Sequence, residues 1–263
     1  MPEESTPPGE PTTAPPPQTL APREERLPDR GPRYKETPAD PQTVSVAEPY
    51  NAVTASFFIL IVAFWAWRIR GRYRQYPFIT CCLPILLAGG IGGTLYHALR
   101  TRTVYFLLDL IPILLLGLAA AVYLALRLVR ASGWRPVALV TVGLLGALVL
   151  MNGVVFRAIP FPNPNWRVNL SYASQAILIL VPLSAVLVRT RFRYGSWVAG
   201  ALASFAIAWF CRLIDGTEFD TLPMGTHWLW HTFGAITTYA LTEYFYRIEG
   251  MPLNPSIPPP GKP

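Results

Sequence analysis

Seven long apolar runs fill the middle of this 263-residue chain and constrain its fold more than any other feature. Most of them reach the roughly 20 residues that a helix needs to cross the hydrocarbon core of a bilayer. Charged residues make up only 14% of the chain, against about 25% in an average soluble domain. The sequence therefore predicts an all-α membrane protein, a bundle of seven transmembrane helices. The predicted spans are 49–67, 77–99, 103–126, 136–156, 168–188, 195–211 and 225–246.

Proline-rich ends flank the apolar region. The first 46 residues contain twelve prolines and no long aliphatic run, so they cannot bury enough apolar surface to offset their chain entropy. We predict a disordered tail over residues 1–46, a membrane domain over 47–248 and a short proline-rich tail over 249–263. The three cysteines indicate no disulfide framework.

The arginines predict an orientation in the membrane. The loops after the first, third and fifth spans hold ten arginines, and the loops after the second, fourth and sixth hold five. Because cytoplasmic loops carry the excess of positive charge, we expect the N-terminus outside and the C-terminus in the cytoplasm. These arginines lie between apolar runs, so the net charge of +7 indicates a membrane surface and no nucleic-acid partner. Arginine outnumbers lysine 20 to 2, which favours a bacterial inner membrane, or an endomembrane if the chain is eukaryotic.

All three histidines of the chain lie within predicted spans. His227 and His231 are four residues apart and therefore share one helix face, a spacing that lets two imidazoles reach one cation. In the predicted topology, His97 near the end of the second span lies at the same outer boundary as this pair. Ionisable groups inside membrane helices are rare and costly. We therefore predict that the three histidines share one metal ion.

Further polar residues are expected at the same depth, and together they predict a single buried polar site in the outer half of the bundle. They are Asp109, Glu48, Asn51 and Gln175.

Simpler roles stay open for some of these residues. Asp109 could pair with Arg100 or Arg102, and Glu48 and Asn51 could cap the first helix. At the opposite end of the seventh span, Glu243 and Arg247 are four residues apart and predict a surface ion pair.

Four segments around these residues resemble the alkaline ceramidases. That family belongs to the CREST superfamily of seven-helix membrane hydrolases, together with the adiponectin-receptor-type proteins. The resemblance covers about residues 46–248 and includes the number of spans and their orientation. The segments are Glu48-Pro-Tyr-Asn51, Gly92-Gly93-Thr94-Leu95-Tyr96-His97, Asp109-Leu110-Ile111-Pro112-Ile113 and His227-Trp228-Leu229-Trp230-His231.

The resemblance implies a set of site residues. The zinc ligands would be His97, His227 and His231, and Asp109 would hold the zinc-bound water. The family usually has a serine four residues before the histidine of the second span. Gly93 stands at that position here, so Thr94 beside it becomes the candidate donor to the oxyanion.

The resemblance leaves a second metal open. The eukaryotic enzymes carry an acidic calcium motif before the first span, and only Glu48 and Asp40 answer to it here. Calcium is therefore not assigned.

These features predict a zinc-dependent intramembrane hydrolase. It would cleave the amide bond of a ceramide-like N-acyl lipid, drawn from the bilayer, to a fatty acid and a sphingoid-type amine. A lipid-binding receptor or degenerate paralogue with structural zinc is the first alternative, suggested by the missing serine. An ester-cleaving lipase is the second.

Overall fold

The computed structural model describes residues 27–130, 133–158, 165–249 and 251, and the regular elements in this part of the chain are all helical. Seven long helical segments follow one another as predicted, the first of them divided at Ser56. They are α1–α2 (Pro49–Ala55 and Phe57–Arg68), α3 (Pro77–Leu99), α4 (Thr103–Val129), α5 (Trp134–Leu150), α7 (Asn165–Arg189), α8 (Gly195–Ile214) and α9 (His227–Glu249). The short elements are η1 (Pro41–Thr43), η2 (Tyr73–Gln75), the π-helical turn η3 (Met151–Val155) and α6 (Phe156–Ala158).

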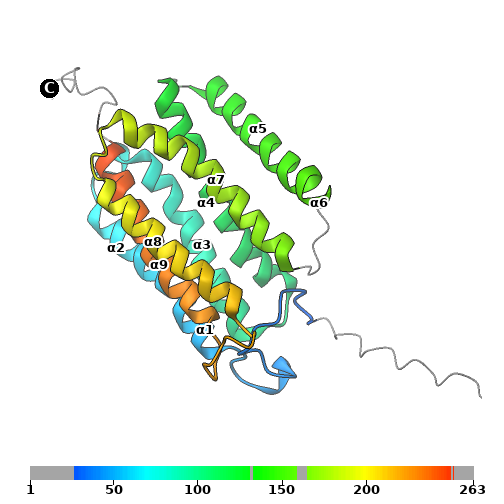
Figure 1. The fold of residues 1–263 in the computed structure, drawn as a ribbon. Helices are drawn as coiled ribbons and strands as arrows, with labels where there is room; N and C mark the ends of the chain where they lie inside the picture. Colours follow the sequence, from blue (N-terminus) through cyan, green and yellow to red (C-terminus); the bar gives the residue numbers. More distant parts are fainter. Residues whose placement is uncertain (1–26, 131–132, 159–164, 250, 252–263) are drawn as a thin grey trace, which may run out of the picture.

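The long helices lie side by side as a bundle, with α5 at its edge (Figure 1). Six of them in the described residues are long and apolar enough to cross a membrane. The exception is α9, which is less apolar than the others. It packs against α1, α2, α3 and α8, and its ionisable residues His227, His231 and Glu243 are buried. The predicted seventh span is therefore a helix packed among the others, and the six remaining predicted spans meet the length and hydropathy expected of membrane-crossing helices.

Helices α3 and α4 approach each other closely at a glycine. A Cβ atom added at Gly92 would lie 2.4 Å from Cβ of Leu108 and 2.5 Å from its carbonyl carbon. A side chain at position 92 would therefore push the two backbones apart. This contact fixes α4 against α3 one residue before Asp109.

The prediction of a disordered tail is wrong for residues 27–46. Leu27 and Asp29 are buried, and the segment crosses the end of the bundle beside the loop between α8 and α9 (Figure 1). Its end donates backbone hydrogen bonds from Ala47 and Glu48 to the last carbonyls of α3. Polar contacts with the bundle replace the apolar burial that the segment lacks. Residues 1–26 and 252–263 of the predicted tails lie outside the described residues.

The predicted surface pair at the far end of α9 is also corrected. Glu243 is only 1% exposed, and its carboxylate pairs with Arg247 at 2.6 Å and with Arg68 of α2 at 2.9 Å. A buried carboxylate needs such partners because an unpaired buried charge is costly. The cluster therefore joins α2 to α9 at the end of the bundle away from the histidines.

The close helix contact can be tested with two glycines. We expect Gly92→Ala to destabilise the protein by about 1–3 kcal/mol, the usual cost of overpacking. Gly143 of α5 has no atom within 4 Å of an added Cβ, so Gly143→Ala should keep or slightly raise the melting temperature. Thermal unfolding of both variants in detergent, followed by circular dichroism, measures the difference. Equal melting temperatures for the two variants would contradict the close α3–α4 contact.

Candidate metal centre

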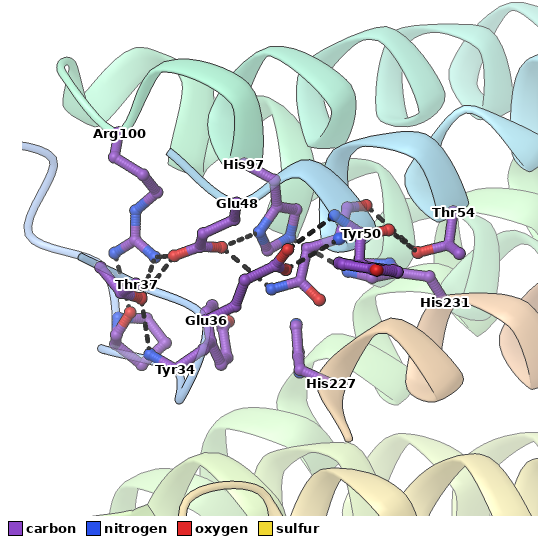
Figure 2. A network of polar contacts seen from close by, with 12 residues as sticks. Tyr34, Glu36, Thr37, Glu48, Tyr50, Thr54, His97, Arg100, His227 and His231 are labelled. Atoms are coloured by element: carbon purple, nitrogen blue, oxygen red, sulfur yellow. Dashed lines mark hydrogen bonds and ion pairs between the residues drawn. The ribbon is translucent and has the colours of Figure 1, made fainter. Parts of the chain in front are cut away.

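The three histidines converge at one end of the bundle, as predicted. His97 lies in the last turn of α3, and His227 and His231 lie in the first two turns of α9 (Figure 2). One nitrogen of each imidazole lies within 4.8 Å of the other two, and Nε2 of His97 is 3.0 Å from Nε2 of His231. All three side chains are buried. We call these residues the histidine cluster.

The histidine cluster could hold a metal ion. Zinc–nitrogen bonds of about 2.0–2.1 Å in a tetrahedral site place two ligand nitrogens about 3.3 Å apart, close to the separation between His97 and His231. Nδ1 of His227 is buried and has no hydrogen-bond partner among the described residues. Three imidazole ligands leave a fourth position open for water or substrate. His97, His227 and His231 are therefore the residues that would hold the metal.

Glu48 orients one of these imidazoles. Its Oε2 lies 2.5 Å from Nδ1 of His97 and also accepts a hydrogen bond from Nδ2 of Asn51 at 3.1 Å. A proton held on Nδ1 by the carboxylate leaves Nε2 free for a metal, the usual arrangement behind metal-binding histidines. Glu48 occupies the N-cap position of α1, but its side chain makes no capping hydrogen bond. The alternative of a simple helix cap is therefore wrong for Glu48.

A buried guanidinium stands behind Glu48. Arg100 pairs with Oε1 of Glu48 (Figure 2). Its Nε donates to Asp29 at 2.6 Å. All three side chains are fully buried. The alternative pairing of Asp109 with Arg100 is thus not formed, because the ion pairs of Arg100 in the described chain go to Asp29 and Glu48. Burial alone would raise the pKa of Glu48, but the His97 hydrogen bond and the Arg100 charge hold this pKa below its ordinary value.

The residues that answer to the calcium motif do not fit calcium. Ca²⁺ needs six to eight oxygen ligands. The oxygens of Glu48 already contact Arg100, Thr37, His97 and Asn51. Asp40 instead accepts a hydrogen bond from the backbone of Gln42 at the start of η1. The positive charge beside the Glu48 carboxylate is the Arg100 guanidinium.

Asp109 and Thr94, the predicted catalytic residues, lie in different surroundings. A Cβ atom added at Gly93 would lie 2.6 Å from Oδ1 of Asp109, so this carboxylate points from α4 at α3, one turn before His97. Thr94 donates its hydroxyl hydrogen bond to the carbonyl of Gly90 in its own helix, at 2.7 Å. The roles of both residues stay predictions.

The recorded hydrogen bonds of Gln175 go to α4 and not to the histidine cluster. Its Nε2 donates to the carbonyls of Ile113 and Leu114 at 3.3 and 2.9 Å. It therefore ties α7 to α4.

Several residues of the centre escape sequence reasoning. Asp215, in the loop before α9, accepts hydrogen bonds from the backbone nitrogens of Thr226 and His227 at 2.8 and 3.1 Å. It caps α9 from eleven and twelve residues away, so local capping patterns give no sign of it. Asp29 and Tyr34 lie in the proline-rich segment and carry no motif. Arg100 was predicted as a possible partner of Asp109, but its partners in the structure are Asp29 and Glu48.

Comparison with protein-family models and with curated proteins finds no match for this chain. The resemblance to the alkaline ceramidases therefore stays a prediction, and the chemistry of the centre is argued from its own residues.

Glu48 can be tested as the carboxylate that orients His97. We expect Glu48→Gln to weaken zinc binding about 10- to 100-fold, the usual effect of losing such a partner. Glu36→Gln is the matched control, because the recorded hydrogen bonds of Glu36 come from the backbone of Tyr50 and Asn51 and not from a histidine. Competition with a zinc-binding dye measures both affinities. Wild-type affinity in Glu48→Gln would remove Glu48 from the metal centre.

Proposed function

We propose that this chain is a zinc-dependent intramembrane hydrolase that cleaves the amide bond of ceramide-like N-acyl lipids. The observation that carries the proposal is the buried histidine cluster, with Glu48 behind His97 and Asp109 on the neighbouring helix. Zinc bound by three histidines polarises a carbonyl group and lowers the pKa of water towards about 7. The products would be a fatty acid and a sphingoid-type amine.

The chain's own residues supply positioning and proton transfer in this proposal. Glu48 holds His97 in one tautomer and one orientation. The Asp109 carboxylate accepts the proton of the attacking water and then donates it to the leaving amine nitrogen, so that the amine departs neutral. Because Asp109 comes from α4 and the histidines from α3 and α9, substrate would bind where these three helices meet.

An open apolar groove between α3 and α4 is compatible with a lipid substrate, as it is with ordinary contact with the bilayer. Its volume is about 540 Å³, and every side chain that lines it is apolar. The lining runs from Val104, near the end of the bundle with the histidines, to Leu115 further along α4. Leu108, which also lines the groove, immediately precedes Asp109. A hydrocarbon chain in this groove would lie along α4 beside the residue proposed to carry the proton.

One observation favours the receptor as the second candidate. Gly93 has no hydroxyl at the position of the family's serine, and the Thr94 hydroxyl is bonded to its own helix. A protein that keeps the metal but lacks this donor could bind a lipid without cleaving it.

Turnover by the purified protein tests the proposal. We expect zinc-loaded protein in detergent to hydrolyse an N-acyl sphingoid lipid, to lose activity when the metal is removed and to regain it with zinc. Asp109→Asn should keep the zinc but lose about 10²–10⁴ in rate, the usual contribution of general acid–base catalysis. Asp40→Asn, a change at an exposed residue, is the control.

Other results would change the assignment. A wild-type rate in Asp109→Asn would remove Asp109 from the mechanism. Faster cleavage of the matched ester than of the amide would favour the lipase. Zinc-loaded protein that cleaves neither substrate would favour the receptor.

We further propose that the N-terminus lies outside and the C-terminus in the cytoplasm of a bacterial inner membrane, from the ten-to-five arginine ratio of the loops. The metal centre would then face the outer leaflet. A reporter fused to the C-terminus should be cytoplasmic, and a tag placed before residue 27 should be labelled from outside intact spheroplasts. A tag that reacts only after lysis would reverse the orientation.

A further inference from the structure

Residues 27–48 form a strap that is anchored on both sides of the histidine cluster. On one side, Asp29 and Glu48 hold Arg100 at the end of α3. On the other side, the backbone nitrogen of Lys35 donates to Asp215 at 3.2 Å, and its ammonium group donates to the carbonyl of Asp220 at 2.7 Å. The part of the strap between these anchors is thus fixed against the loop that precedes α9.

Tyr34 lies between the two anchors, against the histidine cluster. Its ring stacks on the ring of His227 with 3.7 Å between centroids and 16° between planes. The same ring lies 5.5 Å from that of His97. Its backbone nitrogen donates to Oγ1 of Thr37, which in turn donates to Glu48 (Figure 2). Tyr34 is therefore held by the same hydrogen-bond network that orients His97.

His97 and His227 are oriented by different means. His97 has the Glu48 carboxylate at Nδ1, whereas the buried Nδ1 of His227 has no hydrogen-bond partner among the described residues. A ligand side chain without an orienting partner samples several rotamers, which weakens metal binding. The stacked ring of Tyr34 removes that freedom. A metal ion on the imidazole withdraws electrons from it, which strengthens its attraction to the electron-rich face of a phenol ring.

We propose that Tyr34 is a positioning residue of the metal centre, whose ring orients His227 as the Glu48 carboxylate orients His97. We assign this role to the ring, because the hydroxyl bonds to Arg212 and not to a histidine. The inference rests on the proposed function only in that the histidine cluster binds a metal, and it does not require hydrolysis.

Metal binding by full-length variants tests the inference. We expect Tyr34→Phe to bind zinc like the wild type, because the stacked ring is kept. Tyr34→Ala and Tyr34→Leu should each bind about tenfold more weakly, and the visible absorption of bound Co²⁺ should shift because one ligand has changed its orientation. Tyr50→Ala is the control, because Tyr50 is 49% exposed and its recorded ring contact is with Trp228.

Tyr34→Leu keeps the experiment decisive if Tyr34→Ala folds poorly, because leucine fills most of the space without stacking. Wild-type affinity and an unchanged Co²⁺ spectrum in Tyr34→Leu would overturn the inference. So would a loss in Tyr34→Phe equal to that in Tyr34→Leu, which would assign the effect to the hydroxyl. If the wild-type protein binds neither metal, the proposed function fails together with this inference. If it binds both but cleaves no lipid, only the hydrolase proposal fails.

Discussion

The position of the strap and the orientation of His97 both depend on the buried ion pairs of Arg100 with Asp29 and Glu48. A guanidinium removed from water is strongly destabilising unless carboxylates pair with it, and loss of one partner of a buried pair typically costs about 3–5 kcal/mol. Here the partners come from two places far apart in the sequence, Asp29 in the strap and Glu48 before α1. Arg100 therefore fixes where the strap lies. Its backbone has a φ of 49°, in the left-handed region that favours glycine, so the position accepts local strain while keeping this side chain.

Glu48 couples this charge to the metal centre, because one carboxylate serves both. One oxygen faces Arg100 and Thr37, and the other faces His97. The positive charge keeps the carboxylate ionised, and an ionised carboxylate is the stronger acceptor for the imidazole proton. The strap, the end of α3 and the orientation of His97 thus form one cooperative unit. A substitution of Asp29 is therefore expected to change the orientation of His97, although Asp29 has no recorded contact with the histidine cluster.

The spans and the meeting of the three histidines could be predicted because both follow from periodicity. Apolar length places a helix across a membrane, and the four-residue spacing of His227 and His231 puts them on one face whatever surrounds them. The contacts of Arg100, Asp29 and Tyr34 could not be predicted, because they join a proline-rich segment to helix ends and no local pattern encodes such a contact. Glu48 was identified as a polar residue at the right depth, yet its carboxylate orients a histidine instead of capping a helix. Glu243 was placed on the surface because an i, i+4 pair on one helix gives no sign that Arg68 approaches it from α2.

The position of Asp109 changes the meaning of the missing serine. In this fold a Cβ atom at position 93 would lie 2.6 Å from Oδ1 of Asp109, so a serine there would require this carboxylate to move from its present position. Glycine at position 93 leaves room for the carboxylate where it lies against α3, one turn before His97. The missing hydroxyl therefore has two interpretations: in the proposed hydrolase the carboxylate uses the space, and in the receptor the donor is simply absent. In the proposed hydrolase Asp109 would carry the proton without a hydroxyl helper, and stabilisation of the developing negative charge would rest on the metal held by the histidine cluster.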